Sequence, residues 1–454
     1  MRINIKRLLV LASLVLFFAL IWFFVRYFTT GKLVIETNDK NTLIMLQEVS
    51  GDGKPAAEAT GSLSTRISPG EYIATAQNGD SFAKRIIDVK TRQTSVYDLD
   101  PVAHKVLEPV LADGASAVSA DSKKLFYLDP ISMQLSGLNS KNEVSRLSGQ
   151  RFINAEWAGF FGLAKTRDNN LFTATSEGIE PLDTKVFYSL TDEIDYAVSS
   201  KNKVFVAYGT HIYSGEPGKK FKRIYTTKSN QPSIFARAGN LAIIDKSKNQ
   251  TKVVVIDSSG RAVEKNLDAD TLSWSTSAKY LFIKTPAQGL IYDKGMGLVA
   301  KIPQAGASDP TWLDDYTLFY GIDHHLWVYN LVSGEAKTVA AVPREGAVKQ
   351  ISVDGRSYLY VTAEVNEGSK SLVLLRVGLK NQRVNPDALR LHGIFPQNQD
   401  NCHIGYVNFS GKPAMIIRST ADIAQDCLIR TKVELNQNSF DKNRFRYYVY
   451  LSSG

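Results

Sequence analysis

Residues 272–283 read LSWSTSAKYLFI, and residues 310–320 read PTWLDDYTLFY. Each segment has a tryptophan, then a short polar turn, then a run of apolar and aromatic residues, which is typical of a β-hairpin. The tryptophans are Trp274 and Trp312. A third, Trp157, precedes Trp274 by about three times the interval from Trp274 to Trp312. This interval is about 40 residues, and a fixed period of that length indicates a repeat architecture.

The same period locates four weaker copies of this hairpin pattern. Successive anchor positions are separated by nearly equal intervals, each of about 40 residues. Four short strands in about 40 residues is the size of one propeller blade. We therefore expect a mainly β protein with a seven-bladed β-propeller at residues 104–384. The anchors of the seven copies are Val118, Trp157, Ala197, Phe235, Trp274, Trp312 and Ile351.

The ends of the repeat region predict how the ring closes. Residues 104–110 read HKVLEPV, which is strand-like, and they precede the first complete copy. The seventh copy provides only three strands before Asn385. We expect residues 104–110 to supply its outer strand, because closure removes an exposed sheet edge. The tryptophans should fill the space between blades rather than stack on a ligand.

Two local patterns in the repeats resemble TolB-type and WD-repeat propellers. They are the S-x-D-G turn at Ser352–Gly355 and the ending VYNLVSGE at Val328–Glu335. The resemblance covers roughly residues 104–384 and implies a propeller fold. The Gly-His and Trp-Asp dipeptides of WD repeats are absent, so the resemblance assigns no binding residue.

The N-terminus predicts a membrane anchor. Residues 8–28 read LLVLASLVLFFALIWFFVRYF, with one charge at Arg26. A helix of this length spans roughly 30 Å, the thickness of the hydrocarbon core of a bilayer. Arg2, Lys6 and Arg7 precede the segment, so the positive-inside rule keeps residues 1–28 cytoplasmic or in the membrane and exports the rest. The alternative is a cleaved signal peptide, but no good cleavage site follows.

Residues 31–100 are expected to form a small β-sandwich of five or six strands. The polar stretch SGDGKPAAEATG, residues 50–61, is expected to be a loop. The opening Gly31–Ile35 strand of pattern G-x-L-x-I and the turn Pro69-Gly70-Glu71-Tyr72 resemble PEGA modules of bacterial surface proteins. The Pro-Glu-Gly-Ala tetrapeptide itself is absent. The resemblance implies a spacer that stands on the anchor.

Residues 385–454 are expected to form a small C-terminal α+β module. A hairpin of CHIGYVNF and AMIIRS precedes a helix that starts near Thr420, and a final strand follows. Both cysteines, Cys402 and Cys427, lie here. An exported chain can form a disulfide, but the helix would separate the two residues along its axis. A bridge and two separate buried thiols therefore both remain open.

Charge and motifs limit the function. The chain has a formal net charge of +9, but the four basic residues of the anchor leave the exported part near +5. No run of lysine and arginine occurs, so nucleic acid is not an expected partner. The pair His324 and His325 lies in a hairpin turn, where neighbouring side chains should point to opposite faces. We expect no metal and no cofactor, because no catalytic or ligand-spacing motif is present.

Two functions remain. The first is a non-enzymatic binding or scaffold protein, anchored in the cell membrane by one span, whose exported propeller engages a protein or glycan partner in the envelope. The second is a propeller enzyme, a glycan hydrolase or lyase, which would need a pair of facing carboxylates. The absence of any motif favours the first.

The repeat phase predicts where a ligand would bind. The loop before each innermost strand should open on one mouth of the ring, and these loops carry many acids and few bases. Converging acids would attract cationic partners, although aspartate is also common in loops because it forms local turns. Besides Asp195, the acids of this expected mouth are Asp113, Asp192, Glu193, Asp268, Asp270, Asp309 and Glu345.

Overall fold

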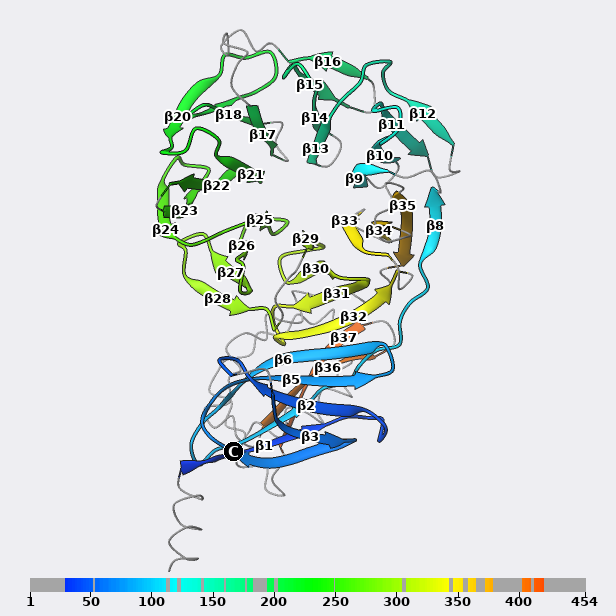
Figure 1. Cartoon of the computed structure of the whole chain (residues 1–454), viewed down its shortest axis with the longest axis vertical. Coiled ribbons are helices and arrows are strands. Elements are labelled where there is room, and N and C mark those ends of the chain that lie inside the picture. Colours follow the sequence, from blue (N-terminus) through cyan, green and yellow to red (C-terminus); the bar gives the residue numbers. More distant parts are fainter. Residues whose placement is uncertain are drawn as a thin grey trace, which may run out of the picture. The chain divides into compact units, whose positions relative to one another are not determined.

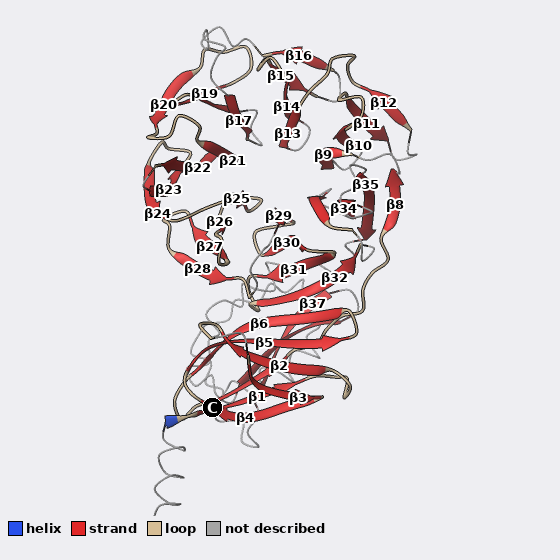
Figure 2. Ribbon diagram, in the orientation of Figure 1, coloured by secondary structure: helices blue, strands red, loops and turns tan. Residues whose placement is uncertain are grey.

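Within the residues that the structure describes, the regular structure is β-structure. Apart from Thr29, which is helical, the elements are strands (Figure 2). Leu8–Phe28 lies outside the described residues, and within them no helix is long and apolar enough to cross a membrane. The computed structural model describes residues 29–51, 54–111, 115–120, 124–139, 143–158, 161–175, 178–182, 194–199, 203–248, 250–303, 308–342, 346–353, 358–364, 372–378, 402–409 and 412–419.

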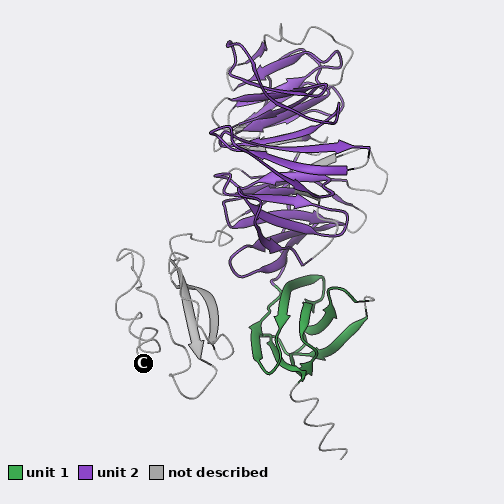
Figure 3. Cartoon of the chain, turned by 90° about the vertical axis from the view of Figure 1, so that its left-hand side faces the viewer, with its two compact units in different colours: residues 1–101, 385–454 green, residues 102–384 purple. Residues whose placement is uncertain are grey.

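The chain divides into two compact units (Figure 3). Unit 1 comprises residues 1–101 and 385–454, and unit 2 comprises residues 102–384. Each unit is described by itself below.

Unit 1 contains a β-sandwich of two sheets. The first sheet has the order β4-β1-β7, in which β1 runs antiparallel to β4 and parallel to β7. The second has the order β3-β2-β5-β6 and is antiparallel. The strands are β1 Gly31–Glu36, β2 Leu43–Glu48, β3 Pro55–Thr60, β4 Ser62–Ile67, β5 Gly70–Asn78, β6 Ser81–Val89 and β7 Thr94–Asp98.

Alternating side chains build the core of the sandwich. Leu33 and Ile35 of β1 are fully buried against Ile44 and Leu46 of β2. One prediction was wrong: Pro55–Thr60, expected within a loop, is strand β3. Its alanines have low strand propensity, but pairing with β2 places them over the core while the polar side chains face outward, and such context overrides propensity.

Unit 2 contains seven antiparallel groups of four strands within its described residues. Blade 1 is β9 Ser116–Ala120, β10 Lys124–Leu128, β11 Leu135–Asn139 and β12 Val144–Arg146. Blade 2 is β13 Asn154–Ala158, β14 Phe161–Lys165, β15 Leu171–Ala174 and β16 Ile179–Pro181. Blade 3 is β17 Ile194–Val198, β18 Val204–Tyr208, β19 His211–Gly215 and β20 Lys222–Thr226. Blade 4 is β21 Ser233–Arg237, β22 Asn240–Ser247, β23 Gln250–Ile256 and β24 Ala262–Asn266.

Three further blades complete the series. Blade 5 is β25 Thr271–Trp274, β26 Tyr280–Lys284, β27 Gly289–Asp293 and β28 Leu298–Lys301. Blade 6 is β29 Ser308–Trp312, β30 Thr317–Ile322, β31 His325–Asn330 and β32 Glu335–Ala341. Blade 7 is β33 Val348–Val353, β34 Tyr358–Glu364, β35 Leu372–Gly378 and the early strand β8 Glu108–Leu111.

The blades form a closed ring (Figure 1). The first strand of each blade lies beside that of the next, in the order β9, β13, β17, β21, β25, β29 and β33, and β33 lies beside β9 again. Strand β8 pairs antiparallel with β35, so a strand from the start of the repeat region completes blade 7. This confirms the predicted closure, with the strand at residues 108–111 instead of 104–110.

The blades are joined by hydrogen bonds that repeat with the sequence period. Trp274 Nε1 donates to the Phe235 carbonyl (3.2 Å), and Trp312 Nε1 donates to the Ser273 carbonyl (3.1 Å), each one repeat earlier in the chain. Trp157 instead stacks on Phe126 of blade 1, with ring centroids 4.7 Å apart. The tryptophans therefore fill the space between blades, as expected, although Trp157 does so by a different contact.

The predicted C-terminal hairpin is present. Strand β36 Cys402–Phe409 pairs antiparallel with β37 Lys412–Ser419. Cys427 and the predicted helix lie outside the described residues, so the disulfide stays a prediction.

Candidate functional site on the inner strands

Most of the acids predicted for the ring mouth lie outside the described residues. This applies to Asp113, Asp192, Glu193 and Glu345. Asp309 has a described backbone only, and it belongs to strand β29 instead of the loop before it.

Asp268 and Asp270 lie in the connection before β25, and both are exposed. The Asp270 carboxylate is 3.4 Å from the Lys246 ammonium, and both side chains are about half exposed. The negative charge of Asp270 is thus partly offset by a neighbouring cation. The acidic mouth stays a prediction.

Asp195 has a structural partner on the next blade. It lies in β17, although the sequence suggested a loop. Its Oδ1 accepts a hydrogen bond from the Tyr196 N–H (3.0 Å), and its Oδ2 accepts one from the Ile234 N–H of β21 (2.9 Å). The side chain therefore links two inner strands.

Glu156 lies on the preceding inner strand, β13, and is half-buried. Burial is the main cause that raises the pKa of its carboxyl well above the ordinary value, and the nearby charge of Asp195 adds to the effect. A hydrogen bond from the Val198 N–H opposes the shift without cancelling it. A carboxyl with a raised pKa keeps its proton to higher pH than an exposed one, because burial and a like charge both disfavour ionisation.

Tyr196 completes the cluster. Its side chain is only 3% exposed, and its hydroxyl has no hydrogen-bond partner within the described part of the chain. Burial first, and then the charges of Glu156 and Asp195, raise the pKa of Tyr196. A buried hydroxyl without a partner costs free energy, so this position can accept or donate a hydrogen bond to a ligand.

We call Glu156, Asp195 and Tyr196 the inner-strand cluster. The cluster offers carboxyl and hydroxyl oxygens from two adjacent blades. The Lys165 ammonium donates to the Ile194 carbonyl (2.9 Å), in the strand that carries Asp195 and Tyr196. The arrangement suits a ligand group that donates hydrogen bonds, either an ammonium or a hydroxyl.

The sequence contained a signal for this cluster that motif reasoning missed. Glu156 and Asp195 are separated by one repeat, so they occupy equivalent positions on neighbouring inner strands. Two acids that are one repeat apart on mostly apolar inner strands are candidates for a shared functional site. Tyr196 gave no separate signal, because tyrosine is common in strands.

The histidine pair differs from its prediction. The rings of His324 and His325 lie side by side, with centroids 3.9 Å apart, instead of on opposite faces. The reason is that Asp323 adopts φ of 53°, so the chain turns between the two strands and does not alternate as a strand does. Within the described residues, no group of three or more histidine, cysteine, aspartate or glutamate side chains is arranged to hold a metal ion.

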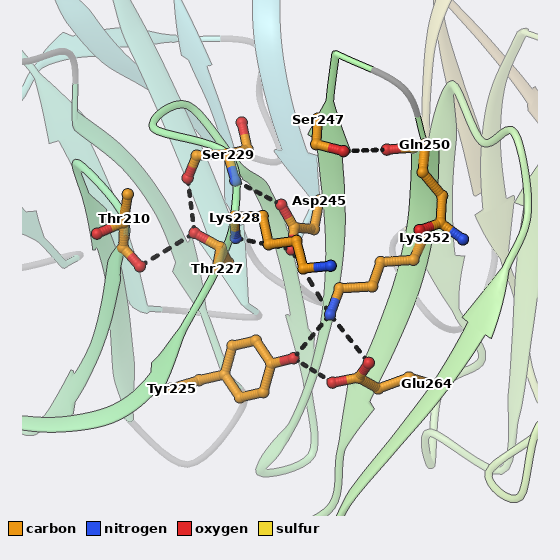
Figure 4. A network of polar contacts seen from close by, with 10 residues as sticks. All are labelled: Thr210, Tyr225, Thr227, Lys228, Ser229, Asp245, Ser247, Gln250, Lys252 and Glu264. Atoms are coloured by element: carbon orange, nitrogen blue, oxygen red, sulfur yellow. Dashed lines mark hydrogen bonds and ion pairs between the residues drawn. The ribbon is translucent and has the colours of Figure 1, made fainter.

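A second polar cluster lies between blades 3 and 4 (Figure 4). The Lys252 ammonium contacts Glu264 Oε2 (2.9 Å) and Asp245 Oδ2 (3.8 Å), and it donates to the Tyr225 hydroxyl (3.3 Å). Tyr225 in turn donates to Glu264. The Asp245 carboxylate also accepts backbone N–H groups of the chain between the two blades. These groups bind one another, so the network joins blades and offers less to a ligand than the inner-strand cluster does.

Comparisons with known proteins give distant structural likenesses. No family model and no curated protein sequence matches the chain. YCF48 from Cyanidioschyzon merolae is similar with 12% identity and a TM-score of 0.45, over 62% of this chain and 100% of that one. A structural genomics protein of unknown function from Bacteroides thetaiotaomicron is similar with 10% identity and a TM-score of 0.38, over 75% of this chain and 91% of that one. The tricorn protease is similar with 11% identity and a TM-score of 0.33, over 70% of this chain and 34% of that one. These values identify no function.

Proposed function

We propose that the chain is a non-enzymatic binding protein that is anchored in the cell membrane by residues 8–28 and engages an envelope partner through its exported propeller. The PEGA-like sandwich at residues 31–100 would act as the spacer between anchor and propeller. The partner is a protein or a glycan that presents hydrogen-bond donors to the inner-strand cluster.

The observation that carries this proposal is the buried Tyr196 hydroxyl. It has no partner within the described part of the chain, and the charges of Glu156 and Asp195 raise its pKa further after burial. Ligand sites typically combine apolar walls with a few converging polar groups, and Tyr196 packs in the apolar cluster between blades 2 and 3. A ligand ammonium or hydroxyl would satisfy the oxygen atoms that the fold leaves there.

The test is a binding screen of the full-length chain with lysine-containing peptides and neutral envelope glycan fragments, measured by calorimetry. For a ligand that binds, Tyr196→Phe and Glu156→Gln should each weaken binding by about threefold to tenfold, the worth of one hydrogen bond. Glu180→Gln is the matched control, because Glu180 is an exposed glutamate on strand β16, in the same blade as Glu156. If ligands bind and neither cluster variant changes the affinity, the inner-strand cluster is not the site.

A glycan hydrolase or lyase is the second candidate, and one observation favours it. Glu156 has a raised pKa and lies near a second carboxyl, and a glycoside hydrolase needs one carboxyl that remains protonated as the general acid. Release of reducing sugar from envelope glycans by the wild-type chain, abolished in Glu156→Gln, would support this function. Unchanged release in that variant would exclude Glu156 as the acid.

A further inference from the structure

Arg237 ends the inner strand of blade 4 in a tight turn. It pairs with Asn240 across the β21–β22 hairpin, and the two central residues, Ala238 and Gly239, have φ of 47° and 82°. Two positive φ values are the mark of a type I′ turn. Alanine adopts this conformation at a cost of roughly 1 kcal/mol, so the turn is held by its surroundings. One contact that holds it is the Gly239 N–H donation to the buried Ser199 hydroxyl of blade 3 (2.7 Å).

The side chains of Arg237 and Asn240 are neighbours. Residues directly opposite in an antiparallel pair point to the same face of the sheet, with Cβ atoms about 5 Å apart. Arg237 alternates with Ala236 and so shares its face with Phe235, which packs against the apolar cluster that contains Leu272 and Trp274 of blade 5. The pair therefore lies on the face of blade 4 that packs against blade 5.

Both side chains have polar atoms without a partner in the described part of the chain. Arg237 Nε is buried and makes no hydrogen bond, and no ion pair of its guanidinium occurs there. Asn240 is 2% exposed, and its amide nitrogen donates to the Arg237 and Ala238 carbonyls (3.4 and 3.2 Å). The remaining Asn240 Oδ1 is buried without a donor. The site thus offers the N–H donors of the positively charged Arg237 guanidinium beside one acceptor, Asn240 Oδ1.

Among the residues that the structure describes, no carboxylate compensates the charge of Arg237. Burial lowers the pKa of its guanidinium, and no acid raises it again. Arginine still carries its charge at neutral pH, and buried charges in proteins are normally paired. A water molecule could complete the hydrogen bonds of these two residues, but it would leave the positive charge without a counter-ion.

We propose that Arg237 and Asn240 form a binding site for an oxyanion that carries a neighbouring hydroxyl, such as the carboxylate of an acidic sugar or the phosphate of a sugar phosphate. The two oxygens of the anion bind the guanidinium fork, which matches carboxylate and phosphate geometry. The hydroxyl donates to Asn240 Oδ1. This site goes beyond the proposed function, because it lies on another blade and selects the opposite charge from the inner-strand cluster.

The test titrates the full-length chain with D-glucuronate, glucose 6-phosphate and glucose, followed by calorimetry. At least one of the two acids should bind, and glucose should not, because it has hydroxyls but no oxyanion. Preference for glucuronate or for glucose 6-phosphate identifies a carboxylate or a phosphate as the natural group. Binding of neither acid, or binding of all three alike, overturns the proposal.

Three variants assign the binding to Arg237. Arg237→Met should weaken binding of the acid about tenfold or more, as expected for loss of a charge-assisted hydrogen bond. Arg237→Lys should weaken it less, because the charge remains while the fork is lost. Arg261→Met is the matched control: Arg261 is an exposed arginine of the same blade, and its loss should leave the affinity unchanged. Equal affinity of wild type and Arg237→Met would overturn the assignment.

Thermal unfolding without ligand separates a binding role from a structural one. If Arg237 is an unpaired charge kept for a ligand, Arg237→Met should have a Tm equal to or above that of the wild type, because a desolvated charge is removed. A marked fall in Tm would mean that Arg237 supports the fold, and it would overturn the proposal.

Discussion

Glu156 differs from the exposed acids of this chain mainly because it is buried, and to a smaller extent because Asp195 follows one repeat later. Its strand neighbours are ordinary, and nothing local marks the carboxyl as unusual. The next blade brings Asp195 and Tyr196 to it, and burial together with a like charge raises its pKa. The raised pKa of Glu156 thus depends on the packing of one repeat against the next, and neither repeat would have it alone.

The raised pKa of Glu156 predicts a particular dependence of stability on pH. The folded protein holds the Glu156 proton more tightly than the unfolded chain, whose glutamate pKa is about 4.3. This contribution to the free energy of unfolding is full below pH about 4.3 and is lost as pH rises through the folded-state pKa. The Glu156→Gln variant has no carboxyl to ionise, so it does not lose this stability. Its Tm minus the Tm of the wild type should therefore increase as the pH rises from about 4 to about 8. Thermal unfolding followed by circular dichroism at several pH values measures this difference in Tm.

The control for this prediction is Asp268→Asn, which removes an exposed carboxylate of the same unit. Its Tm should run parallel to that of the wild type over the whole range. A Glu156→Gln variant that also runs parallel would show that Glu156 ionises normally.

Strand β8 has an importance for the ring that its short length does not suggest. It pairs with β35, and the Glu108 carboxylate contacts the Arg376 guanidinium at 2.8 Å across that pairing. The pair is substantially exposed, so its contribution to stability is small. Val110 is more important, because it packs on the cluster of Leu125, Tyr127 and Leu374 that joins blades 1 and 7.

Val110→Asp should therefore open the junction between blades 1 and 7. A carboxylate at this position would lose hydration beside apolar side chains, and we expect a loss of about 1–3 kcal/mol in the free energy of unfolding. Val106→Asp is the matched control, because Val106 is 82% exposed in the same segment; its cost should stay below about 0.5 kcal/mol. Denaturant unfolding compares the two, and equal effects would mean that β8 does not hold the ring closed.

The propeller was more predictable than the candidate sites. The seven blades and their closure followed from one property, the regular recurrence of an apolar strand and a polar turn, because each blade must bury the same faces. Strand β3 was missed since Ala57 and Ala59 carry little strand signal and depend on β2 for their place. Asp195 was expected in a loop and Glu156 was overlooked, because the properties of both come from contacts between blades, which the period alone does not reveal.

The anchor prediction concerns the whole molecule. Residues 8–28 are long and apolar enough to span a bilayer, and Arg2, Lys6 and Arg7 should hold the N-terminus in the cytoplasm. The full-length chain with a C-terminal tag, produced in bacterial cells, should stay in the membrane fraction after carbonate washing. A chain that lacks residues 8–28 should appear in the soluble fraction.

Protease added to intact spheroplasts tests the orientation of the same molecule. The tag should be removed, because the positive charges before the span oppose export of the N-terminus and so direct the C-terminal part outward. Replacing Arg2, Lys6 and Arg7 together by Glu is the control, since it removes the charge bias and should leave a larger protected fraction of the tag. A wild-type tag that resists protease until the membrane is broken would contradict the proposed topology, and the propeller would then have to find its partner in the cytoplasm.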